Sequence, residues 1–422
     1  MSFKNWEKRK LVDITTKIGS GSTPRGGNNS YKDDGIPFIR SQNVYNCEFS
    51  PLGLVYIDEE QAKKLSNVQL EKDDILLNIT GDSVARCTKV PKEFIGGRVN
   101  QHVSIIRADK EHLDSDFLKY YLVNQHMQEF MLSLARMGGT RAALTKGMIE
   151  AFEIYLPSLE EQKEIAHILY SFDKKIEVNN QISKKLEEMA RAIFKQWFIE
   201  FEFPNKDGTP YKSNGGEMIE SEIGLIPKEW EVNTLGTIVE LLTKSINPQK
   251  YPERVFEHFS IPALDNSKTP EIQLGETIKS NKYIISDKVV LISKLNPTTK
   301  RIWNPVPQGE YPVCSTEFMV YKPREKSIFS YVYELINSDI FSEMLVSHAT
   351  GSTGSRQRVK PSDTLNFKFP IPPINIMNEF STIIETLHNN VSIKNIENRK
   401  LVLTRDTLLP KLMSGEIGVS LG

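Results

Sequence analysis

Apolar residues recur every three or four positions along two long stretches of the chain, Pro157 to Phe198 and Pro372 to Met413. This spacing is typical of a helix that packs along another helix. A shift of 215 positions, the difference between 165 and 380, superposes the two patterns. The coinciding pairs are Ile165 with Phe380, Leu169 with Ile384, Phe172 with Leu387, Ile176 with Val391, Leu186 with Leu401 and Ile193 with Leu408. The pattern predicts two long helices built on one plan.

The first long helix has a clear predicted start. Ser158 and Glu161 form a capping box, in which the serine hydroxyl and the glutamate side chain satisfy free backbone N–H groups. The helix is predicted to run to about Phe198, a length of roughly 40 residues and about 60 Å. Two such helices can pair antiparallel and bury both apolar stripes, which would give the molecule a pseudo-two-fold axis.

The segments before each long helix show a mixed α/β pattern, and they repeat as well. Short apolar runs predict strands in the first half at Gly35–Arg40, Leu54–Ile57, Asp74–Ile79, His102–Arg107 and Phe152–Pro157. In the second half they predict strands at Lys282–Leu295 and Ser315–Lys322. Asp114–Ala135 is predicted as one amphipathic helix with an aspartate cap, and the second half repeats it at an offset of 214. Ser315–Lys322 aligns with Asn100–Arg107 at an offset of 215.

The predicted fold class is therefore α/β (α+β), with two globular units separated by a pair of long antiparallel coiled-coil helices and an internal pseudo-two-fold repeat. The boundary between the halves is a stretch rich in Pro, Gly, Asn and Lys. The expected domains are 1–156, the first globular unit; 157–203, the first long helix; 204–222, a linker; 223–370, the second globular unit; 371–415, the second long helix; and 416–422, a tail.

Composition bounds the class of protein. The chain has 422 residues, enough for two or three cores, and 39% of them are hydrophobic. It contains no run of 18 apolar residues and no secretory signal, and its three cysteines form no CxxC pair, so we expect a cytoplasmic protein. A net charge of -1 argues against a purely electrostatic nucleic-acid binder, yet it allows a small basic strip on a neutral body.

Motifs for catalysis are absent from the sequence. There is no phosphate-binding GxxxxGK[ST] loop, no HExxH and no paired Cys/His spacing for a metal. The nearest approach to an adenine methyltransferase motif, Asn304 to Pro307, lacks the adjacent prolines and the aromatic residue. We therefore expect a protein that binds and does not catalyse, with no metal site and no cofactor of its own.

Polar loops interrupted by glycine lie at matched positions of both halves. Arg, Lys, Asn, Gln, Ser and Thr are the residues that reach base edges and phosphates in DNA. From these loops the predicted DNA-binding residues of the first half are Thr23, Arg25, Arg40, Gln42, Asn43, Thr80, Asp82, Ser83, Arg98, Gln101, Arg136, Thr140 and Arg141. Those of the second half are Lys294, Asn296, Thr298, Lys300, Arg301, Ser352, Ser355, Arg356, Gln357 and Arg358. Any one such loop is more often a solvated turn, but two equivalent sets favour a binding function.

The aromatic end of the first long helix is a further candidate site. Trp197, Phe198 and Phe201 lie outside the predicted helix–helix seam. We expect them to dock either a partner protein or the opposite globular unit, and we assign them to partner binding.

Several motifs, taken with the two half-chain repeats, resemble the specificity subunit of type I restriction–modification enzymes. One is the Leu-Pro-x-Leu-x-Glu-Gln tract at Leu156–Gln162, and another is the Ile-Pro-Pro tract before the second long helix. Gly224–Trp230 opens the second half, and Leu408–Ile417 closes the chain with the characteristic Leu-Leu-Pro-Lys-Leu-Met-Ser-Gly-Glu-Ile. The departures are a missing Gly-x-x-Pro before Trp6 and Asn-Ile-Met-Asn in place of the usual acidic-Gln start of the second helix.

The resemblance implies a non-catalytic, DNA-binding subunit. Each globular unit would be a target recognition domain that reads one half of a split, asymmetric sequence in double-stranded DNA. The helices would set the gap and bind two modification subunits, which carry S-adenosylmethionine and methylate adenine. Restriction subunits, which use ATP and Mg²⁺, would join that core. Half-site centres roughly 10 bp apart would place both domains on one face of the DNA.

Two other functions remain open from the sequence. One is a stand-alone DNA-modifying enzyme, against which the absent cofactor and metal motifs argue. The other is a coiled-coil adaptor without DNA contact, against which the matched polar loops argue.

Overall fold

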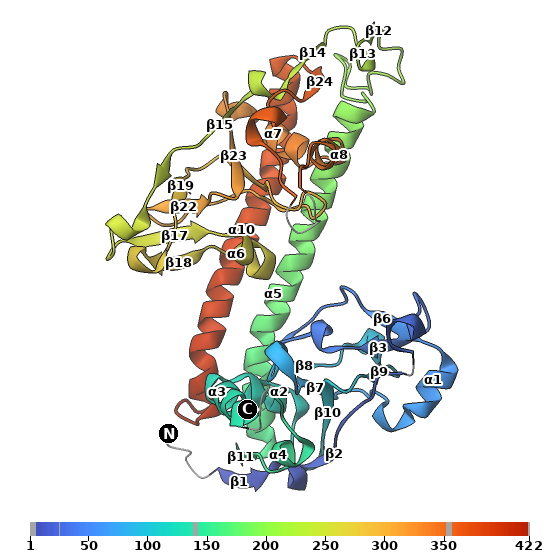
Figure 1. The fold of residues 1–422 in the computed structure, drawn as a ribbon, viewed down its shortest axis with the longest axis vertical. Coiled ribbons are helices and arrows are strands. Elements are labelled where there is room, and N and C mark those ends of the chain that lie inside the picture. Colours follow the sequence, from blue (N-terminus) through green and yellow to red (C-terminus); the bar gives the residue numbers. More distant parts are fainter. Residues whose placement is uncertain (1–5, 25, 138–141, 352–356, 421–422) are drawn as a thin grey trace. The chain divides into compact units, whose positions relative to one another are not determined.

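The computed structural model describes residues 6–24, 26–137, 142–351 and 357–420 (Figure 1). The chain divides into two compact units, which we call unit 1 (residues 1–178 and 400–422) and unit 2 (residues 179–399). The two long helices, α5 (Leu159–Phe194) and α10 (Ile374–Met413), each contribute residues to both units. Each unit therefore contains the start of one long helix and the end of the other, and we describe each unit by itself.

The described residues of unit 1 form strands β1 to β11 and four short α-helices. The strands are β1 Glu7–Lys10, β2 Thr15–Ser20, β3 Ile36–Ile39, β4 Val44–Tyr45, β5 Glu48–Phe49, β6 Val55–Ile57, β7 Ile75–Asn78, β8 Cys87–Lys89, β9 Arg98–Val99, β10 Val103–Ala108 and β11 Glu153–Leu156. The helices are α1 Glu59–Lys64, α2 Ser115–Val123, α3 Gln125–Met137 and α4 Lys146–Glu150. The strands form a four-stranded sheet of order β2-β10-β7-β8, a three-stranded sheet β6-β3-β9, and the pairs β1-β11 and β4-β5.

Unit 2 repeats this plan with additions. Its strands are β12 Met218–Ser221, β13 Gly224–Pro227, β14 Glu231–Thr234, β15 Val239–Leu241, β16 Ser245–Ile246, β17 Val255–Phe259, β18 Glu271–Leu274, β19 Lys282–Ile284, β20 Val290–Ser293, β21 Ile302–Trp303, β22 Pro312–Ser315, β23 Phe318–Pro323 and β24 Lys368–Ile371. Its short helices are α6 Ile261–Ser267, α7 Phe329–Ile336, α8 Asp339–Ser347 and α9 Pro361–Thr364. The sheet β15-β23-β20-β21 has the same order as β2-β10-β7-β8, and β16-β19-β22-β17-β18 extends the arrangement of β6-β3-β9 by two strands.

The central strands of both four-stranded sheets are apolar on both faces, because each sheet separates two cores. In β7, Ile75 and Leu77 point into the core that contains the long helices, whereas Leu76 points into a core formed with β3 and β9. In β20, Val290 and Ile292 face the helical core, and Leu291 faces the opposite one. This two-sided burial explains why these strands read as continuous apolar runs and not as alternating ones.

Both long helices are anchored in each unit by their apolar stripes. In unit 1, Ile165 and Leu169 of α5 share a core with Leu409 and Leu412 of α10. In unit 2, the corresponding core contains Phe194 of α5 and Phe380 of α10, whose ring centroids lie 5.9 Å apart. The cores are alike in position, although aromatic side chains in unit 2 replace the aliphatic ones of unit 1.

Helix–helix contacts within unit 2 run antiparallel. Asn179 Nδ2 donates to Asn398 Oδ1 at 2.8 Å, and Asn398 Nδ2 donates to Asn180 Oδ1 at 2.9 Å. In the π-helical turn Lys195–Ile199 that follows α5, Phe198 reaches Phe380, so the residue numbers rise on one helix as they fall on the other. The fully buried Asn179 amide restricts the register of the two helices, because a shift would leave it unpaired in the interior.

The structure corrects the predicted helix over Asp114–Ala135. Two helices, α2 and α3, replace it, and they meet at Asn124. Asn124 has an extended ψ of 138°, and its Oδ1 accepts the backbone N–H of His126 at 3.0 Å. An asparagine that bonds its own backbone two residues on competes with the helix, and this local bond ends α2.

The predicted linker, 204–222, is not structureless in its second part. It contains strand β12, which pairs with β13 as a hairpin. It also contains Tyr211, whose ring stacks on Phe203 at 4.6 Å and whose backbone N–H donates to the Phe203 carbonyl at 2.9 Å. The apolar side chains at the edges of this polar stretch are therefore sufficient to fold it against unit 2.

Candidate nucleic-acid interface

One edge of the four-stranded sheet of unit 1 gathers most of the predicted binding residues of that unit. The register pairs Ser104 with Ser20 and Val103 with Asn78, so the ends of β2 and β7 lie beside the start of β10. The loops that follow β2 and β7 and precede β10 consequently meet there. They carry Thr23, Thr80 and Gln101 respectively.

Side chains from these three loops form one chain of hydrogen bonds in unit 1. The Thr23 hydroxyl donates to Gln101 Oε1, and Gln101 Nε2 lies 3.1 Å from His102 Nε2. The other ring nitrogen, His102 Nδ1, lies 2.6 Å from Thr80 Oγ1. We call Thr23, Thr80, Gln101 and His102 the first edge cluster. It is a polar, partly exposed surface with no Lys, Arg, Asp or Glu among its four members.

Arg40 and Gln42 lie in the loop after β3, next to the first edge cluster. Both donate to the Gly53 carbonyl, at 2.6 Å and 3.1 Å. The buried Asn78, the last residue of β7, donates through Nδ2 to the Ser41 carbonyl at 2.8 Å and so ties this loop to the sheet edge. The Asn100 N–H donates to the Ile39 carbonyl at 3.0 Å, which fixes the same loop beside Gln101. The remaining residues predicted near this edge, Asp82, Ser83 and Arg136, are at least partly exposed.

Two predicted residues of unit 1 do not face the solvent, and the structure corrects them. Arg98 is only 7% exposed, and its guanidinium donates to the carbonyls of Ala62 and Gly97, each at 3.0 Å. Burial lowers the pKa of Arg98. Asn43 is fully buried and caps its own loop, since its Oδ1 accepts the Arg40 N–H at 3.0 Å. Both residues hold loops in shape from inside, so neither is placed to contact DNA.

The equivalent edge of unit 2 is built by the same backbone contacts. In unit 1, Ile79 donates to the His102 carbonyl at 2.9 Å and accepts from the Leu144 N–H at 2.8 Å. In unit 2, Lys294 donates to the Glu317 carbonyl and accepts from the Val359 N–H, each at 3.0 Å. Every residue of the second set has the number of its counterpart plus 215.

A second pair of contacts extends this correspondence. Gly81 donates to the Ala142 carbonyl at 3.1 Å, and Asn296 donates to the Gln357 carbonyl at 3.0 Å, again 215 positions later. Both turns are left-handed, with φ of 73° at Gly81 and 47° at Asn296, a conformation that glycine and asparagine adopt most readily. The two units therefore present their edge loops on one conserved backbone frame with different side chains.

Charged residues occupy the frame in unit 2. Lys294 Nζ donates to the Thr316 carbonyl at 2.8 Å and lies 3.8 Å from the Glu317 carboxylate. Arg358 Nη2 lies 3.5 Å from the same carboxylate, and the Arg358 side chain is 60% exposed. We call Lys294, Glu317, Gln357 and Arg358 the second edge cluster. Asn296 lies in the same loop as Lys294, and so does the exposed Thr298.

Lys300 and Arg301 are directed away from the second edge cluster. Lys300 Nζ donates to the Asn337 carbonyl, and Arg301 Nε pairs with Asp265 Oδ1 at 2.7 Å. These two cations stabilise the fold of unit 2 and are correspondingly less available to a ligand. The predicted residues Arg25, Thr140, Arg141, Ser352, Ser355 and Arg356 lie outside the described residues.

Residues that sequence reasoning missed are His102 and Glu317, which stand at the same place in the two frames. The backbone N–H of His102 donates to Asn100 Oδ1 at 3.0 Å, and that of Glu317 donates to Ser315 Oγ at 3.2 Å. The repeat itself contained the signal, because it aligns Asn100–Arg107 with the tract that starts at Ser315. A comparison of the loops position by position would have selected both residues.

The aromatic segment that follows α5 is not an exposed docking surface. Trp197 and Phe198 are 6% and 5% exposed and belong to the main core of unit 2. Phe198 contacts Phe380 at 4.9 Å, and Phe201 contacts Trp230 edge-on at 5.4 Å. Of the two alternatives, Trp197, Phe198 and Phe201 pack on the second globular unit, so their assignment to partner binding is corrected.

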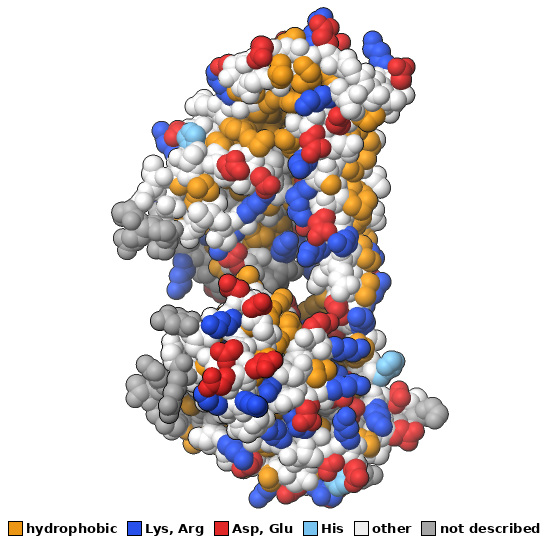
Figure 2. Space-filling model, turned by 90° about the vertical axis from the view of Figure 1, so that its right-hand side faces the viewer, with side chains coloured by type: hydrophobic (Ala, Val, Ile, Leu, Met, Phe, Trp, Pro, Cys, Tyr) orange, Lys and Arg blue, Asp and Glu red, His pale blue; other side chains and the backbone are white. Residues whose placement is uncertain are grey.

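Charge is balanced over the surface that Figure 2 shows, where basic and acidic side chains are interspersed. Among the described residues no group of three or more His, Cys, Asp or Glu side chains is arranged to hold a metal ion. In that same part of the chain, no helix has the length and apolar content that spanning a membrane requires.

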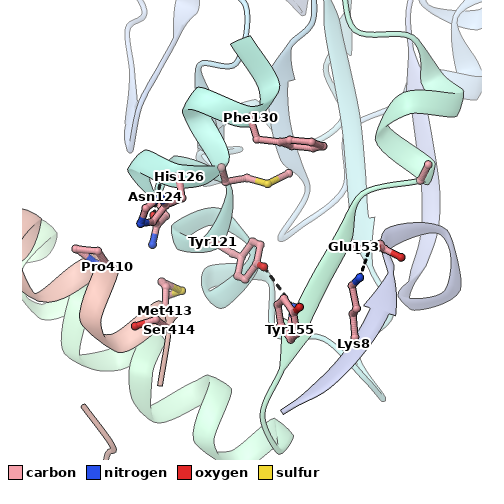
Figure 3. Close-up of a pocket in the computed structure, with 12 residues that line it drawn as sticks. Lys8, Tyr121, Asn124, His126, Phe130, Glu153, Tyr155, Pro410, Met413 and Ser414 are labelled. Atoms are coloured by element: carbon pink, nitrogen blue, oxygen red, sulfur yellow. Dashed lines mark hydrogen bonds and ion pairs between the residues drawn. The ribbon is translucent and has the colours of Figure 1, made fainter. Parts of the chain in front are cut away.

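A cavity of about 370 Å³ in unit 1 lies away from the edge cluster, between the β1–β11 pair, α3 and the end of α10 (Figure 3). Tyr121, Phe130 and Met413 supply its apolar wall. Lys8 and Glu153, which form an ion pair, lie on its polar side. None of the residues predicted to bind DNA lines this cavity.

Comparisons with known proteins identify the family. Residues 3–188 and 227–404 each match the type I restriction modification DNA specificity domain. The chain is 27% identical to the MjaIX specificity subunit of Methanocaldococcus jannaschii over 434 aligned residues, which cover 99% of this chain and 94% of that protein. It is 22% identical to the HindI specificity subunit of Haemophilus influenzae, with 98% and 100% covered.

A solved structure supports the same assignment at the level of the fold. The S subunit of a type I restriction–modification system from M. genitalium superposes with a TM-score of 0.57 at 15% identity, covering 98% of both chains. Together with the two matched domains, one in each half of the repeat, this likeness accounts for nearly the whole length. The chain belongs to the family of specificity subunits of type I restriction–modification systems.

Proposed function

We propose that the chain selects the DNA sequence on which a type I restriction–modification complex acts, and that each unit reads one half of a bipartite, asymmetric site in double-stranded DNA. The observation that carries this proposal is the shared backbone frame at the two sheet edges. Two related domains that recognise different DNA sequences need the same backbone arrangement with different side chains. The first edge cluster offers hydroxyl, amide and imidazole groups, and the second offers Lys294, Gln357 and Arg358.

Both sets of side chains suit direct readout. Amide side chains pair with adenine, arginine pairs with guanine, and hydroxyls bond to bases or phosphates. Hydrogen bonds among the side chains of the first edge cluster, and the bond from Lys294 Nζ to the Thr316 carbonyl, hold these groups in place before DNA arrives, which reduces the entropy lost on binding. The balanced charge of the chain is compatible with this role if partner subunits share the neutralisation of the phosphates.

The helices α5 and α10 are proposed to pair along their length as an antiparallel coiled coil that sets the gap between the half-sites. The contacts of α5 with α10 inside each unit support this role. The same helices are proposed to bind two modification subunits, since exposed apolar side chains such as Leu403 and Ile393 remain on α10.

Catalysis is assigned to the partners. S-adenosylmethionine belongs to the modification subunits, and ATP and Mg²⁺ belong to the restriction subunits that join the complex. The chain itself is proposed to be non-catalytic and to act in the cytoplasm. A stand-alone DNA-modifying enzyme would instead methylate or cleave DNA without partners, and purified chain incubated with DNA and S-adenosylmethionine distinguishes the two.

Methylome sequencing of cells that carry this chain with its modification subunits tests the proposal. We expect one methylated motif with two specified half-sites and an unspecified gap. Removal of seven residues from each long helix, one heptad on both sides of the pair, keeps the apolar register. This variant is expected to change the accepted gap and leave both half-sites as they were. A motif without a gap would contradict the proposal, and an unchanged gap in the variant would contradict the spacer role.

A further inference from the structure

Residue 317 has a defined place at the centre of the second edge cluster. Its backbone is fixed on both sides, since its N–H donates to Ser315 Oγ at 3.2 Å and its carbonyl accepts the Lys294 N–H at 3.0 Å. The side chain therefore starts from a rigid base at the sheet edge, between the loop after β20 and the segment that contains Gln357 and Arg358. A rigid base is what a group that reads a base edge needs.

The carboxylate of Glu317 retains capacity to accept hydrogen bonds. Lys294 Nζ and Arg358 Nη2 lie 3.8 Å and 3.5 Å away, within ion-pair range and at or beyond the limit of a direct hydrogen bond. Its Oε2, on the Lys294 side, is buried and accepts no hydrogen bond from any described residue. The side chain as a whole is 31% exposed, so the oxygen available to a ligand is Oε1, on the Arg358 side.

The two cations reduce the repulsion between the Glu317 carboxylate and the phosphates of a bound DNA. A lone carboxylate would be repelled by the phosphates, whose charges are closely spaced along the duplex. Lys294 and Arg358, one on each side of Glu317, offset that repulsion. In unit 1 the same frame position carries His102, whose ring nitrogens already contact Thr80 and Gln101. The two units therefore differ in chemistry at this position.

We propose that Glu317 is a specificity-determining residue of unit 2, and that its carboxylate accepts a hydrogen bond from the exocyclic amino group of a cytosine in the half-site read by that unit. Carboxylates select cytosine in the major groove because its N4 amino group is the donor displayed there. This assignment rests on the proposed function and names one contact within it.

The test is methylome sequencing of cells that carry the whole complex with Glu317→Gln, Glu317→Ala or Glu317→Asp. The amide of Gln has the size of the carboxylate but can also donate, and Ala has no acceptor. Both are expected to lower the preference for cytosine at one position of one half-site by about 5-fold or more. Asp keeps the carboxylate and is expected to retain cytosine. The other half-site and the gap are expected to stay unchanged.

Two control variants complete the experiment. Glu325→Gln changes an exposed carboxylate of unit 2 and is expected to leave the motif unchanged. His102→Gln is expected to affect only the other half-site.

Two results overturn the assignment of Glu317. One is an unchanged motif in Glu317→Ala. The other is a uniform loss of methylation at all sites without a changed base preference, which indicates that Glu317 only holds Lys294 and Arg358 in place. The proposed function fails separately, if the wild-type complex yields no bipartite motif at all.

Discussion

In each unit a polar side-chain contact joins a short helix to a long helix at the same place of the repeat. The acidic residue is on the long helix in one unit and on the short helix in the other. In unit 1 the acid is on the long helix: Asp173 of α5 accepts from the Tyr120 hydroxyl of α2 at 2.6 Å. In unit 2 the acid is on the short helix: Glu334 of α7 lies 2.8 Å from His388 Nε2 of α10. Tyr120 and Glu334 are related by the offset of 214 found for these helices, and Asp173 and His388 by 215.

The two anchors differ in how completely they are paired. Asp173 also binds Arg405 Nη1 at 2.6 Å and lies 3.5 Å from Lys119 Nζ. Burial opposes the charge of Arg405, but the hydrogen bond to Asp173 keeps the pKa of Arg405 above its ordinary value. Burial and the Asp173 carboxylate raise the pKa of Tyr120, so its hydroxyl remains a donor.

The anchor in unit 2 has fewer partners. The side chains of Glu334 and His388 are 2% and 8% exposed, and within the described structure Glu334 Oε2 and His388 Nδ1 have no hydrogen-bond partner. His388 also borders a cavity of about 60 Å³. The comparison shows that both units have a polar contact at the same place of the repeat, although different residue types form it. A link with several charged partners is expected to be harder to replace than a link with one.

Removal of the acid in unit 1 is the strongest test of that comparison. Asp173→Ala leaves the Lys119 and Arg405 cations without their buried partner, and breaking such a group costs about 3–5 kcal/mol. We expect a loss of this size in the free energy of unfolding of unit 1, measured by urea denaturation of the whole chain. Glu188→Ala, at an exposed ion pair of α5, is the control. A loss below about 1 kcal/mol for Asp173→Ala would contradict the account of the anchor.

Removal of the acid in unit 2 is expected to cost less. Glu334→Ala leaves one ring nitrogen of His388 unpaired in the interior, for which about 1–3 kcal/mol is typical. Glu334→Gln keeps an acceptor for that nitrogen and should recover most of the loss. The same denaturation experiment measures both variants. If Glu334→Ala proved more destabilising than Asp173→Ala, the number of partners would not decide the strength of the anchor.

A smaller change in stability is expected from a change in pH, and it again distinguishes unit 2 from unit 1. His258 of unit 2 has its pKa lowered from 6.5, first by burial, although its hydrogen bond to Gln273 acts in the opposite direction. A lowered pKa in the folded state means that unfolding takes up a proton. The contribution of His258 to stability is thus fully present above about pH 6.5 and is lost as the pH falls toward the folded-state value.

Urea denaturation at several pH values measures this dependence. We expect His258→Gln to flatten the decline in stability of unit 2 below pH 6.5. His126→Gln, at an exposed histidine of unit 1, should leave the pH profile unchanged. A profile that is the same for His258→Gln and the wild type would show that other groups cause the decline.

The sequence predicted the repeated elements because their signals are local or periodic. The stripes of α5 and α10, and the offset of 215 between them, were readable from spacing alone. The division of Asp114–Ala135 was not predicted, because a single asparagine bond at Asn124 outweighs a continuous amphipathic pattern. The mixed α/β class with two domains and the family therefore followed from the sequence, whereas a break inside an element did not.

The loops that form the candidate site could be predicted from the sequence, but the individual residues that face the solvent could not. Arg98 and Thr23 lie in equally polar loops, but only the structure shows that Arg98 points inward to the Ala62 and Gly97 carbonyls. The buried links of Asp173 and His388 join residues more than 50 positions apart, so no local pattern reveals them. The repeat aligns His102 with Glu317, and the contacts of distant segments then place this position within each edge cluster.

The central claim is that each unit reads its own half-site. An exchange of residues 223–370 for the corresponding segment of a related specificity subunit, followed by methylome sequencing of cells that carry the complex, tests it most directly. We predict a motif in which one half-site changes to that of the donor subunit, while the other half-site and the gap remain. A motif that changes in both half-sites, or in neither, would contradict the account.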